Sequence, residues 1–588
     1  MCGIVGYIGT QDTKKRLIEG LKRLEYRGYD SSGMAVLDRS FLQSFKAVGR
    51  VKNLEQKVKH LTSSKIGIAH TRWATHGAVN LVNAHPHNSN DGRFAIVHNG
   101  VIDNYKVLIS DYLKDISFES ETDTEVIANL LMFNMNQYNY EEAIQKTLQV
   151  LKGSYALVII DKERPNQLIV AKNKSPLIVG KNSDEIMIAS DVLALAGYVN
   201  QIHTLDDETF MIINETDYKL YDLELNQAKA TFDPFNLDPI QSERGHYSHY
   251  MLKEIAEQPE VLRRLVNHFN VHRIEPSIKD LILKSSSIEI IAAGTSYHAG
   301  LYAKSLFEKT LSKKTHVHVA SEFAYYPPEL SDNPLFIFIS QSGETADLIA
   351  CLPHIKNNQS KLITLSNVAT SRLAKEADVF FDLLAGPEIA VASTKAFTAE
   401  VALIALIINQ IKPELHFKKA LLEAANAMEN QWNARDTIKA YIETHFIKHN
   451  AFYIGRGIDY TIALEASLKL KEISYIQSEA FPAGELKHGT IALIEQDTPV
   501  ISILTEGLTA GLTRANIEEV RARGANSLVI SKKSLSQSQD QIIIPDIHPL
   551  IDPLMAVIPT QLVAYYAALQ RGHDIDKPRN LAKSVTVE

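Results

Sequence analysis

The sequence is poor in cysteine, with only Cys2 and Cys351 in 588 residues. Two cysteines so far apart in a large chain do not form a disulfide framework, which favours a reducing compartment. Long apolar runs are missing too. The longest stretch, around Val401–Ile411, is shorter than the roughly 20 apolar residues that cross a bilayer. We therefore expect a cytoplasmic protein with no membrane partner.

Runs of basic residues are absent as well. The formal net charge of −8 is spread along the chain, and no cluster of lysine and arginine could follow a phosphate backbone. A nucleic-acid partner is therefore not expected. The N-terminal stretch MCGIVGYIG has no basic residues ahead of an apolar segment, so we expect no secretory signal.

The remaining composition is that of ordinary globular domains, with 45% hydrophobic and 22% charged residues. The length predicts about three to five domains. Residues 1–231 show short β-rich runs separated by turn residues, with helix-length segments near Thr13–Arg23 and Thr124–Met135. This pattern predicts a sheet-rich α+β domain. Residues 232–248 contain two prolines and no periodicity, which is typical of a linker.

After the linker, a helical segment at His249–Val271 is followed by apolar strands that alternate with helix-length segments. We expect strands at Ile288–Ala293, Leu335–Ile339 and Lys361–Leu365. Such alternation predicts a parallel sheet with helices on both faces.

The second half also resembles itself. A strand, a glycine turn and a helix occur around Gly294 and again around Gly457. This repetition indicates two α/β subdomains, at residues 249–425 and 426–577, followed by a tail at 578–588. The alternative is that any two units of strand, glycine and helix look alike.

Cys2 is a candidate nucleophile, because removal of Met1 leaves a thiol and a free α-amine on one residue. An α-amine has a pKa of about 7.7–8.0, so it can accept the thiol proton near neutral pH and later protonate a leaving amine. The alternative is an ordinary buried cysteine on a strand.

Several motifs accompany Cys2 in the first half of the chain. They are CGIVG at residues 2–6, YRGYDSSG at 26–33, HTRWATHG at 70–77, NAHPH at 83–87, HNG at 98–100 and ETDTE at 121–125. In order and spacing this set resembles the class II glutamine amidotransferases. The resemblance implies an N-terminal nucleophile (Ntn) hydrolase domain that hydrolyses glutamine.

Amide hydrolysis suits the residues of these motifs. Attack of a thiolate on an amide makes an oxyanion, and Asn99 with the backbone N–H of Gly100 can supply two donors to it. Arg72 suits a substrate carboxylate and Asp123 a substrate ammonium group, although structural ion pairs are the alternative. The resemblance adds two residues to the glutamine pocket, Thr75 and His76.

This half also contains a closely spaced pair of histidines and a tryptophan. His85 and His87 lack a third ligand at suitable spacing, so we expect a structural role for them and no metal. Trp73 lies between Arg72 and the predicted glutamine pocket and is one of two tryptophans. We predict that it gates the transfer of ammonia, with simple packing against the sheet as the alternative.

Two hydroxyl-rich turns follow strands in the second half. Thr295 and Ser296 begin a helix, where unpaired N–H groups attract phosphate, although hydroxyls are also ordinary helix caps. The second turn follows LFIFI and contains Ser340, Gln341, Ser342 and Thr345. Neither turn has a Walker lysine, which disfavours nucleotides. The pair resembles the sugar isomerase (SIS) domain, which binds phosphorylated sugars.

In the second copy the matching loops, around Gly457 and Gly507, have fewer hydroxyls, so we expect phosphate in the first copy. The stretch 465–489 and the terminus DKPRNLAKSVTVE resemble the glutamine:fructose-6-phosphate aminotransferase family. With both halves in that order, the resemblance covers nearly the whole chain.

The resemblance implies how the sugar reacts. His488 would open the furanose ring, Lys583 would form a Schiff base at C2, and Glu472 would move a proton between C1 and C2. Lys469 would handle a hydroxyl proton, although on the residues alone Lys469 and Glu472 could be a surface ion pair. Two more residues would line the sugar site, Val391 and Ser393.

The implied partners are L-glutamine and fructose 6-phosphate, with no cofactor, and the implied assembly is a homodimer. One alternative is another amidotransferase such as amidophosphoribosyltransferase, but we find no paired acidic loop for phosphoribosyl pyrophosphate. Another is a non-catalytic sugar-phosphate sensor, which would not need Cys2. The chain departs from the expected pattern in three loops, at Val79, His246 and Pro482.

Overall fold

The computed structural model describes residues 2–38, 41–61, 64–73, 77–215, 217–237, 243–433 and 435–586. The chain divides into two compact units. Unit 1 comprises Met1–Glu243 with Ser584–Glu588, and unit 2 comprises Arg244–Lys583. No helix in the described part of the chain is long and apolar enough to span a membrane.

Unit 1 contains two antiparallel sheets, as the α+β prediction requires. The eight-stranded sheet has the order β15-β11-β9-β10-β1-β4-β2-β3. Its strands are β1 (Gly3–Gly9), β2 (Ser31–Asp38), β3 (Phe41–Val48), β4 (Ile66–Arg72), β9 (Ile178–Lys181), β10 (Glu185–Ala189), β11 (Gln201–Thr204) and β15 (Asp233–Pro234).

The seven-stranded sheet has the order β14-β13-β12-β8-β7-β6-β5. Its strands are β5 (His87–Asn88), β6 (Phe94–Ile102), β7 (Gly153–Asp161), β8 (Gln167–Asn173), β12 (Thr209–Asn214), β13 (Tyr218–Asp222) and β14 (Gln227–Ala228). The helices of the unit are α1 (Thr13–Leu24), α2 (Val51–Lys57), α3 (Tyr105–Tyr112), α4 (Asp123–Met135) and α5 (Tyr140–Val150).

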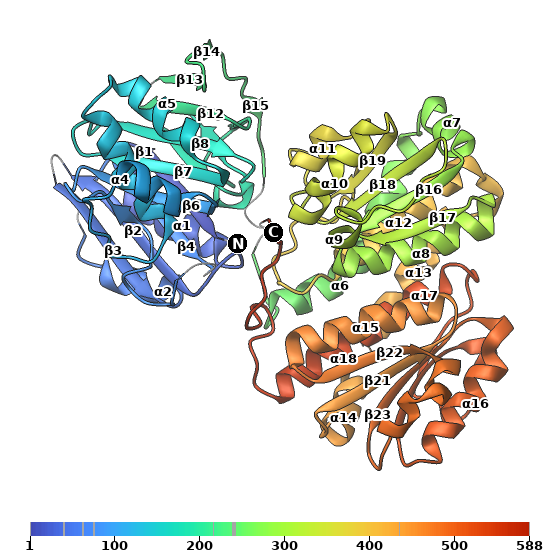
Figure 1. Ribbon diagram of the computed structural model, residues 1–588. Coiled ribbons are helices and arrows are strands. Elements are labelled where there is room, and N and C mark those ends of the chain that lie inside the picture. Colours follow the sequence, from blue (N-terminus) through green and yellow to red (C-terminus); the bar gives the residue numbers. More distant parts are fainter. Residues whose placement is uncertain are drawn as a thin grey trace. The chain divides into compact units, whose positions relative to one another are not determined.

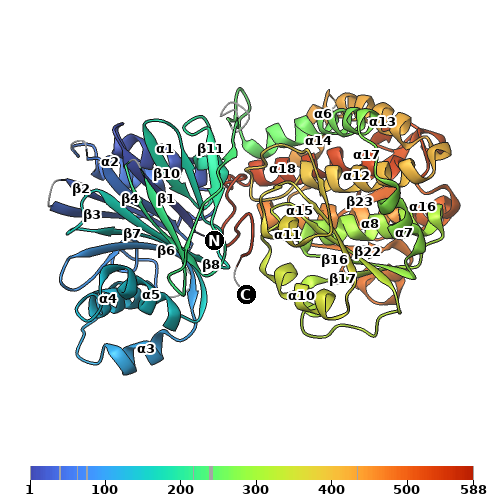
Figure 2. The same cartoon turned by 90° about the horizontal axis from the view of Figure 1, so that it is seen from above.

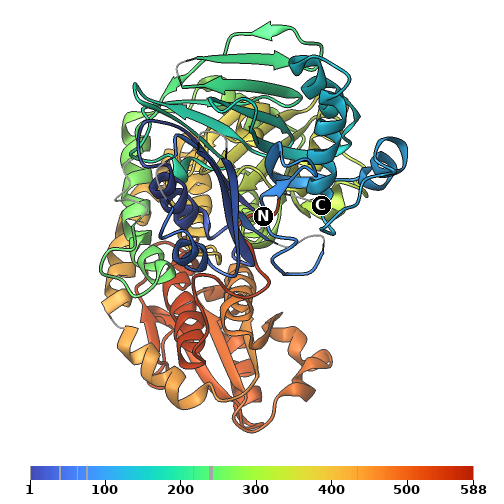
Figure 3. The ribbon, with the colours of Figure 1, turned by 90° about the vertical axis from the view of Figure 1, so that its left-hand side faces the viewer.

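The two sheets of unit 1 pack face to face. Figure 2 shows α1 outside one sheet and α3, α4 and α5 outside the other, so the unit has four layers. In Figure 3 the earliest strands of this unit are dark blue and the later ones teal to green, and the eight-stranded sheet combines strands of both kinds. Alternating residues of β1 and β6, such as Ile4 and Val97, fill the space between the sheets.

Unit 2 contains two parallel sheets with the same connectivity (Figure 1). The first has the order β17-β16-β18-β19-β20 and the second the order β22-β21-β23-β24-β25. The first consists of β16 (Ser287–Ala292), β17 (Thr315–Val319), β18 (Pro334–Ser340), β19 (Lys361–Ser366) and β20 (Val379–Asp382). The second consists of β21 (Asn450–Gly455), β22 (Gln477–Pro482), β23 (Pro499–Leu504), β24 (Asn526–Lys532) and β25 (Ile542–Ile544).

Helices cover both faces of each sheet in unit 2, as the alternating pattern predicts. They are α6 (Tyr250–Val271), α7 (Pro276–Lys284), α8 (Gly294–Leu311), α9 (Ala320–Phe323), α10 (Ala346–Asn357), α11 (Arg372–Glu376), α12 (Lys395–Ile411), α13 (Phe417–Asn433), α14 (Arg435–His445), α15 (Ile458–Ser474), α16 (Ala510–Arg521), α17 (Asp552–Met555) and α18 (Val557–Gln570). One continuous core joins α6, α8, α12, α13, α15 and α18 to the inner faces of both sheets.

The predicted doubling of the second half is confirmed by this shared topology. Gly294 and Gly457 both follow the first strand of their subdomain and have positive φ angles, 56° and 59°. The predicted strands and helices are also confirmed, with ends shifted by a few residues. The predicted limit at residues 425 and 426 falls inside α13, and the domain limits stay predictions.

Candidate active sites

Strand pairing brings Cys2 to the end of β4. Gly3 pairs with Thr71, so the preceding residue lies beside Arg72 and Trp73. The Trp73 backbone N–H donates a hydrogen bond to Cys2 Sγ at 3.2 Å. Burial raises the pKa of the Cys2 thiol, and the Trp73 hydrogen bond and the Arg72 charge oppose this rise. The thiol therefore requires a nearby base before it can act as a nucleophile.

Asn99 and Gly100 lie together on β6 beside the same cysteine. Asn99 Nδ2 donates to the Cys2 carbonyl oxygen at 2.9 Å. Gly100 has a φ of +132°, and a Cβ there would lie 2.0 Å from the carbonyl oxygen of Ser154. Only glycine fits this position, which leaves its backbone N–H close to Asn99. Of the two predicted oxyanion donors, Asn99 therefore contacts Cys2 directly, and Gly100 is the next residue of β6.

His70 forms a hydrogen bond with the side-chain amide oxygen of Asn99. Its Nε2 lies 3.1 Å from Asn99 Oδ1 and 3.0 Å from the His98 carbonyl oxygen. These two neighbours can only accept, whereas a third neighbour, His85 Nδ1 at 3.0 Å, can accept or donate, so Nε2 carries the proton and donates. Burial lowers the pKa of His70 to about 3, and these hydrogen bonds oppose the effect only in part. A neutral His70 therefore fixes the Asn99 carbonyl and leaves its NH2 group facing Cys2.

His85 and His87 belong to the same buried cluster. His85 contacts His70 at 3.0 Å and the Thr124 hydroxyl at 3.2 Å, and His87 contacts the Thr122 hydroxyl at 3.1 Å. Burial lowers the pKa of both histidines well below its usual value. These contacts agree with the structural role expected for the pair.

Arg72 and Asp123 are both buried in unit 1. Arg72 donates to the carbonyl oxygens of Ala78 and Gly77 at 3.3 and 3.4 Å. Asp123 begins α4 and accepts a hydrogen bond from the Ile102 N–H at 2.8 Å. Thr75 and His76, the other two predicted glutamine-binding residues, lie outside the described residues.

The two hydroxyl-rich turns of unit 2 lie at the same edge of the first sheet. β16 and β18 are parallel neighbours, so Thr295 and Ser296 follow one strand where Ser340 ends the other. The Ser340 hydroxyl contacts that of Thr345 at 3.0 Å and accepts from the Gly343 N–H at 3.0 Å. Gln341 and Ser342 lie within this same turn.

At the matching turn of the second subdomain, the side chain of Asp459 occupies the position that an anion would take. Asp459, at the start of α15, accepts hydrogen bonds from the backbone N–H groups of Thr505 and Glu506 at 2.7 and 3.0 Å. It also accepts from the Thr505 hydroxyl at 2.5 Å. A carboxylate thus occupies the donors that an anion at this turn would need.

Lys469 and Glu472 are not a surface pair. Lys469 is buried and lies 2.6 Å from Glu472 and 3.4 Å from Glu465. It also donates to the Thr295 hydroxyl at 2.9 Å, and that hydroxyl donates to Glu465 at 3.1 Å. These contacts join α15 to the start of α8, so the two subdomains contribute to one polar site.

Lys583 meets the loop that contains Val391 and Ser393. Its Nζ lies 2.5 Å from Glu388 Oε2, to which the Ser393 hydroxyl also donates at 2.8 Å. The Val391 N–H donates to the Asp576 carbonyl oxygen at 3.0 Å, which ties the same loop to the C-terminal segment. Glu388 was not predicted from the sequence.

Two further buried carboxyl groups, those of Glu254 and Glu400, lie in this region. The sequence did not predict them either. Glu254 accepts from the backbone N–H groups of Ile389 and Ala390, and Glu400 accepts from the Ser296 hydroxyl at 2.7 Å. Burial raises the pKa of each glutamate to about 8. Both are therefore protonated near neutral pH, which limits the negative charge buried in this region.

His488 does not join this cluster. It ends a short 3-10 helix at Ala483–His488 and is exposed. Among the described residues, no hydrogen bond links it to Lys469, Glu472 or Lys583.

Comparison with known proteins agrees with both halves. Residues 55–246 match the family described as "Glutamine amidotransferase domain", and residues 281–410 and 447–571 match the "SIS domain". The fold and sites therefore define an enzyme in which a class II glutamine amidotransferase domain precedes two SIS domains.

Relatives that match the full length of the chain identify the family within this class of enzymes. Proteins named "Glutamine--fructose-6-phosphate aminotransferase [isomerizing]" from Geobacillus kaustophilus and Listeria monocytogenes are 49% and 47% identical, with both chains covered completely. The C-terminal domain of glucosamine-fructose-6-phosphate aminotransferase from Francisella tularensis is 35% identical, with a TM-score of 0.54, covering 57% of this chain and all of that one. The chain belongs to the family of isomerizing glutamine–fructose-6-phosphate aminotransferases.

A more distant structure shares the fold of unit 2. The tagatose-6-phosphate ketose/aldose isomerase of Escherichia coli is 18% identical, with a TM-score of 0.50 over 56% of this chain and 96% of that one.

Proposed function

We propose that the chain converts D-fructose 6-phosphate and L-glutamine to D-glucosamine 6-phosphate and L-glutamate. The observation that carries the proposal is that one chain holds two complementary sites. Cys2 lies beside the amide donor Asn99 in unit 1. In unit 2, the buried pair of Lys583 and Glu388 accompanies a hydroxyl-rich turn at Ser340.

In unit 1, Cys2 Sγ attacks the side-chain amide carbon of glutamine. After removal of Met1, the α-amine of Cys2 accepts the thiol proton and passes a proton to the departing nitrogen. One N–H of Asn99 remains available for the oxyanion while the other binds the Cys2 carbonyl oxygen, and the Gly100 N–H is the second donor. Water then cleaves the thioester, so that glutamine and water yield glutamate and ammonia.

Substrate glutamine is held by its charged end. Arg72 pairs with its α-carboxylate and Asp123 with its α-ammonium group. The placement of both side chains near Cys2 supports this assignment: Arg72 ends β4 beside Cys2, and Asp123 accepts from Ile102 at the end of β6, the strand that contains Asn99. The family resemblance assigns Thr75 and His76 to the same pocket.

The sugar phosphate binds at the first subdomain of unit 2. Six side chains form this cradle at neighbouring strand ends: Thr295, Ser296, Ser340, Gln341, Ser342 and Thr345. The carboxylate of Asp459 at the matching turn of the second subdomain supports the assignment, because it repels a second phosphate there.

The sugar reacts in its open-chain form, after His488 opens the ring. Lys583 attacks the C2 carbonyl and forms an imine with loss of water, and ammonia then displaces the lysine. Glu472 takes a proton from C1 and returns it to C2, while Lys469 moves the hydroxyl proton. Fructose 6-phosphate and ammonia thus yield glucosamine 6-phosphate and water, which balances the water used by glutamine. Val391 and Ser393 line this site.

Ammonia passes between the two sites without mixing with bulk water, where protonation would remove its nucleophilic lone pair. Trp73 is our candidate for the gate, since its backbone contacts the nucleophile directly. We further propose that the protein is cytoplasmic and forms a homodimer. The exposed His488 serves the sugar site of the neighbouring copy in this dimer.

An assay with both substrates tests the function. Purified protein is incubated with glutamine and fructose 6-phosphate, and glutamate and amino sugar are quantified. Equal amounts of both products are expected, and Cys2→Ala should abolish both. Glutamate without amino sugar would indicate a different amidotransferase, and neither product would indicate a sensor.

A further inference from the structure

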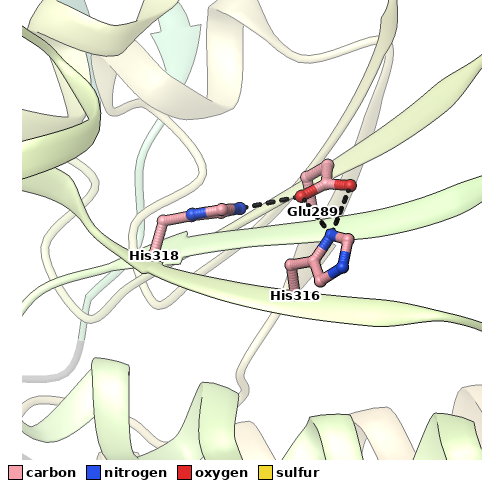
Figure 4. Close-up of side chains that lie close together, drawn as sticks. All are labelled: Glu289, His316 and His318. Carbon is pink, nitrogen blue, oxygen red and sulfur yellow. Dashed lines mark hydrogen bonds and ion pairs between the residues drawn. The ribbon is translucent and has the colours of Figure 1, made fainter. Parts of the chain in front are cut away.

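Three side chains that can bind a metal meet at the edge of the first parallel sheet. Glu289 lies on β16, and His316 and His318 lie on the edge strand β17. Glu289 pairs directly with His316 in the parallel register. Because residues two apart on a strand share a face, both histidines lie on the same face as the carboxylate. Figure 4 shows both rings directed toward Glu289.

The potential ligand atoms are close together. His316 Nδ1 lies 3.0 and 3.1 Å from the two carboxylate oxygens of Glu289, and His318 Nε2 lies 2.7 Å from Oε2. One ligand atom from each of the three side chains can be chosen so that all three lie within 4.8 Å of one another. Ligands about 2.0–2.2 Å from one tetrahedral ion lie roughly 3.3–3.5 Å apart, so small side-chain rotations suffice to enclose a metal.

We propose that Glu289, His316 and His318 form a Zn²⁺ site. Two imidazole nitrogens and one carboxylate are donors that Zn²⁺ accepts, and together they fill three of its four tetrahedral positions. His316 has 42% of its side chain exposed, so the ion can enter from solvent and a water can complete its coordination.

The surroundings of the cluster resemble those of metal ligands. The Ser287 hydroxyl donates to Glu289 Oε1 at 2.6 Å and restrains the carboxylate. The His318 ring lies against Phe323, with ring centres 5.1 Å apart, which fixes its orientation. Such outer contacts normally orient the ligands of a metal site.

The competing interpretation is a hydrogen-bonded ion cluster without metal. Glu289 is 1% exposed, and a buried carboxylate needs a compensating positive charge. A zinc ion uses both histidines in their neutral form. It would also tie the edge strand β17 to β16.

Metal binding is measured on the full-length Cys2→Ala protein, so that the thiol of unit 1 does not compete for the ion. After incubation with Zn²⁺ and desalting, we expect one zinc per chain by elemental analysis. Co²⁺ added instead should give the visible ligand-field bands of a four-coordinate site. Isothermal titration with each ion then provides the affinity.

Three variants in the same background assign the site. Loss of an outer contact lowers metal affinity about 10–100-fold, so Ser287→Ala should weaken binding within that range. His316→Ala and Glu289→Gln remove ligands and should weaken binding by at least about 100-fold. His272→Ala is the matched control, because it removes an exposed histidine that stacks on His268 at the end of α6.

X-ray absorption at the zinc edge of the unsubstituted site keeps the test independent of variant folding. Two nitrogen ligands with carboxylate and water oxygen support the proposal. Absence of bound zinc, a different ligand set, or an affinity that His316→Ala leaves unchanged would overturn it.

Discussion

Lys583 and Glu388 form an ion pair whose side chains are only 4% and 0% exposed. Burial alone would raise the pKa of Glu388, but the charge and hydrogen bond of Lys583, with two backbone N–H groups, lower it to about 2. Glu388 is therefore a carboxylate at neutral pH. The proposed attack of Lys583 on the sugar carbonyl therefore requires that sugar binding first separate this pair.

Glu388→Gln should destabilise unit 2 and impair amino-sugar formation. The amide keeps the size of the side chain but leaves the Lys583 charge buried without its partner, which costs about 3–5 kcal/mol. Urea unfolding measures this loss, and glutamine hydrolysis should survive. The double variant Glu388→Gln with Lys583→Met should recover part of the stability, because it removes the unpaired charge. Unchanged stability in the single variant would contradict the importance of the pair.

Gly100→Ala should abolish glutamine hydrolysis while leaving isomerisation of fructose 6-phosphate in unit 2. The added Cβ would lie 2.0 Å from the Ser154 carbonyl oxygen, so β6 must move and carry the oxyanion donors with it. Gly92→Ala is the matched control, since Gly92 also has a positive φ but no atom lies within 4 Å of its Cβ position. Comparable glutaminase activity in both variants would refute this explanation.

Ser340→Ala should raise the KM for fructose 6-phosphate about tenfold to 100-fold. A hydrogen bond to a charged group contributes about 1.5–3 kcal/mol, and kcat should change less because the phosphate is remote from C1 and C2. Thr505→Val removes the hydroxyl that binds Asp459 in the second subdomain, and it should leave the KM unchanged. A larger effect from Thr505→Val would place the phosphate in the other subdomain.

The stability of unit 1 should depend on pH through His70. Its pKa is lowered from 6.5 to about 3 in the folded chain, mainly by burial. The unfolded chain therefore binds this proton at a higher pH than the folded chain does. Stability is complete above about pH 6.5 and is lost as pH falls toward about 3, by up to about 1.4 kcal/mol per pH unit.

Urea unfolding between about pH 8 and pH 4 measures this dependence. His70→Gln should show a shallower slope, whereas His60→Ala, which removes an exposed histidine of the same unit, should retain the original slope. Equal slopes for all three proteins would show that His70 does not control the acid sensitivity.

Much of the fold could be predicted because local patterns determine it. The run LFIFI is apolar at every position, as a strand covered on both faces of a parallel sheet requires, and it forms β18. The glycine turns before α8 and α15 likewise indicated the two subdomains. Cys2, Asn99 and Arg72 could be selected as candidates because their motifs are local in sequence.

Residues that act through distant contacts could not be predicted. Glu388 forms its ion pair with Lys583, which is 195 residues away, and Glu465 contacts His298, which is 167 residues away. In the sequence, Glu254 and Glu400 resemble solvated residues of amphipathic helices, since burial depends on tertiary packing. The register of β16 and β17 similarly decides that Glu289 faces His316.

Transfer of ammonia between the sites should depend on Trp73. Trp73→Ala keeps the backbone N–H that binds Cys2 Sγ, so glutamine hydrolysis should largely persist. Removal of the indole opens the route to solvent, and amino sugar formed per glutamate released should fall well below one. A ratio that stays at one would reject Trp73 as the gate without affecting the reaction itself.

The most direct measurement follows the amide nitrogen itself. The unsubstituted protein is given fructose 6-phosphate and glutamine labelled with ¹⁵N in its side-chain amide, in buffer that contains excess unlabelled ammonium. Mass spectrometry then determines the isotope in the amino sugar. If hydrolysis and amination are coupled in one enzyme, nearly all of the glucosamine 6-phosphate carries ¹⁵N. Amino sugar with the isotope ratio of the bulk ammonium, or no amino sugar at all, would contradict the account.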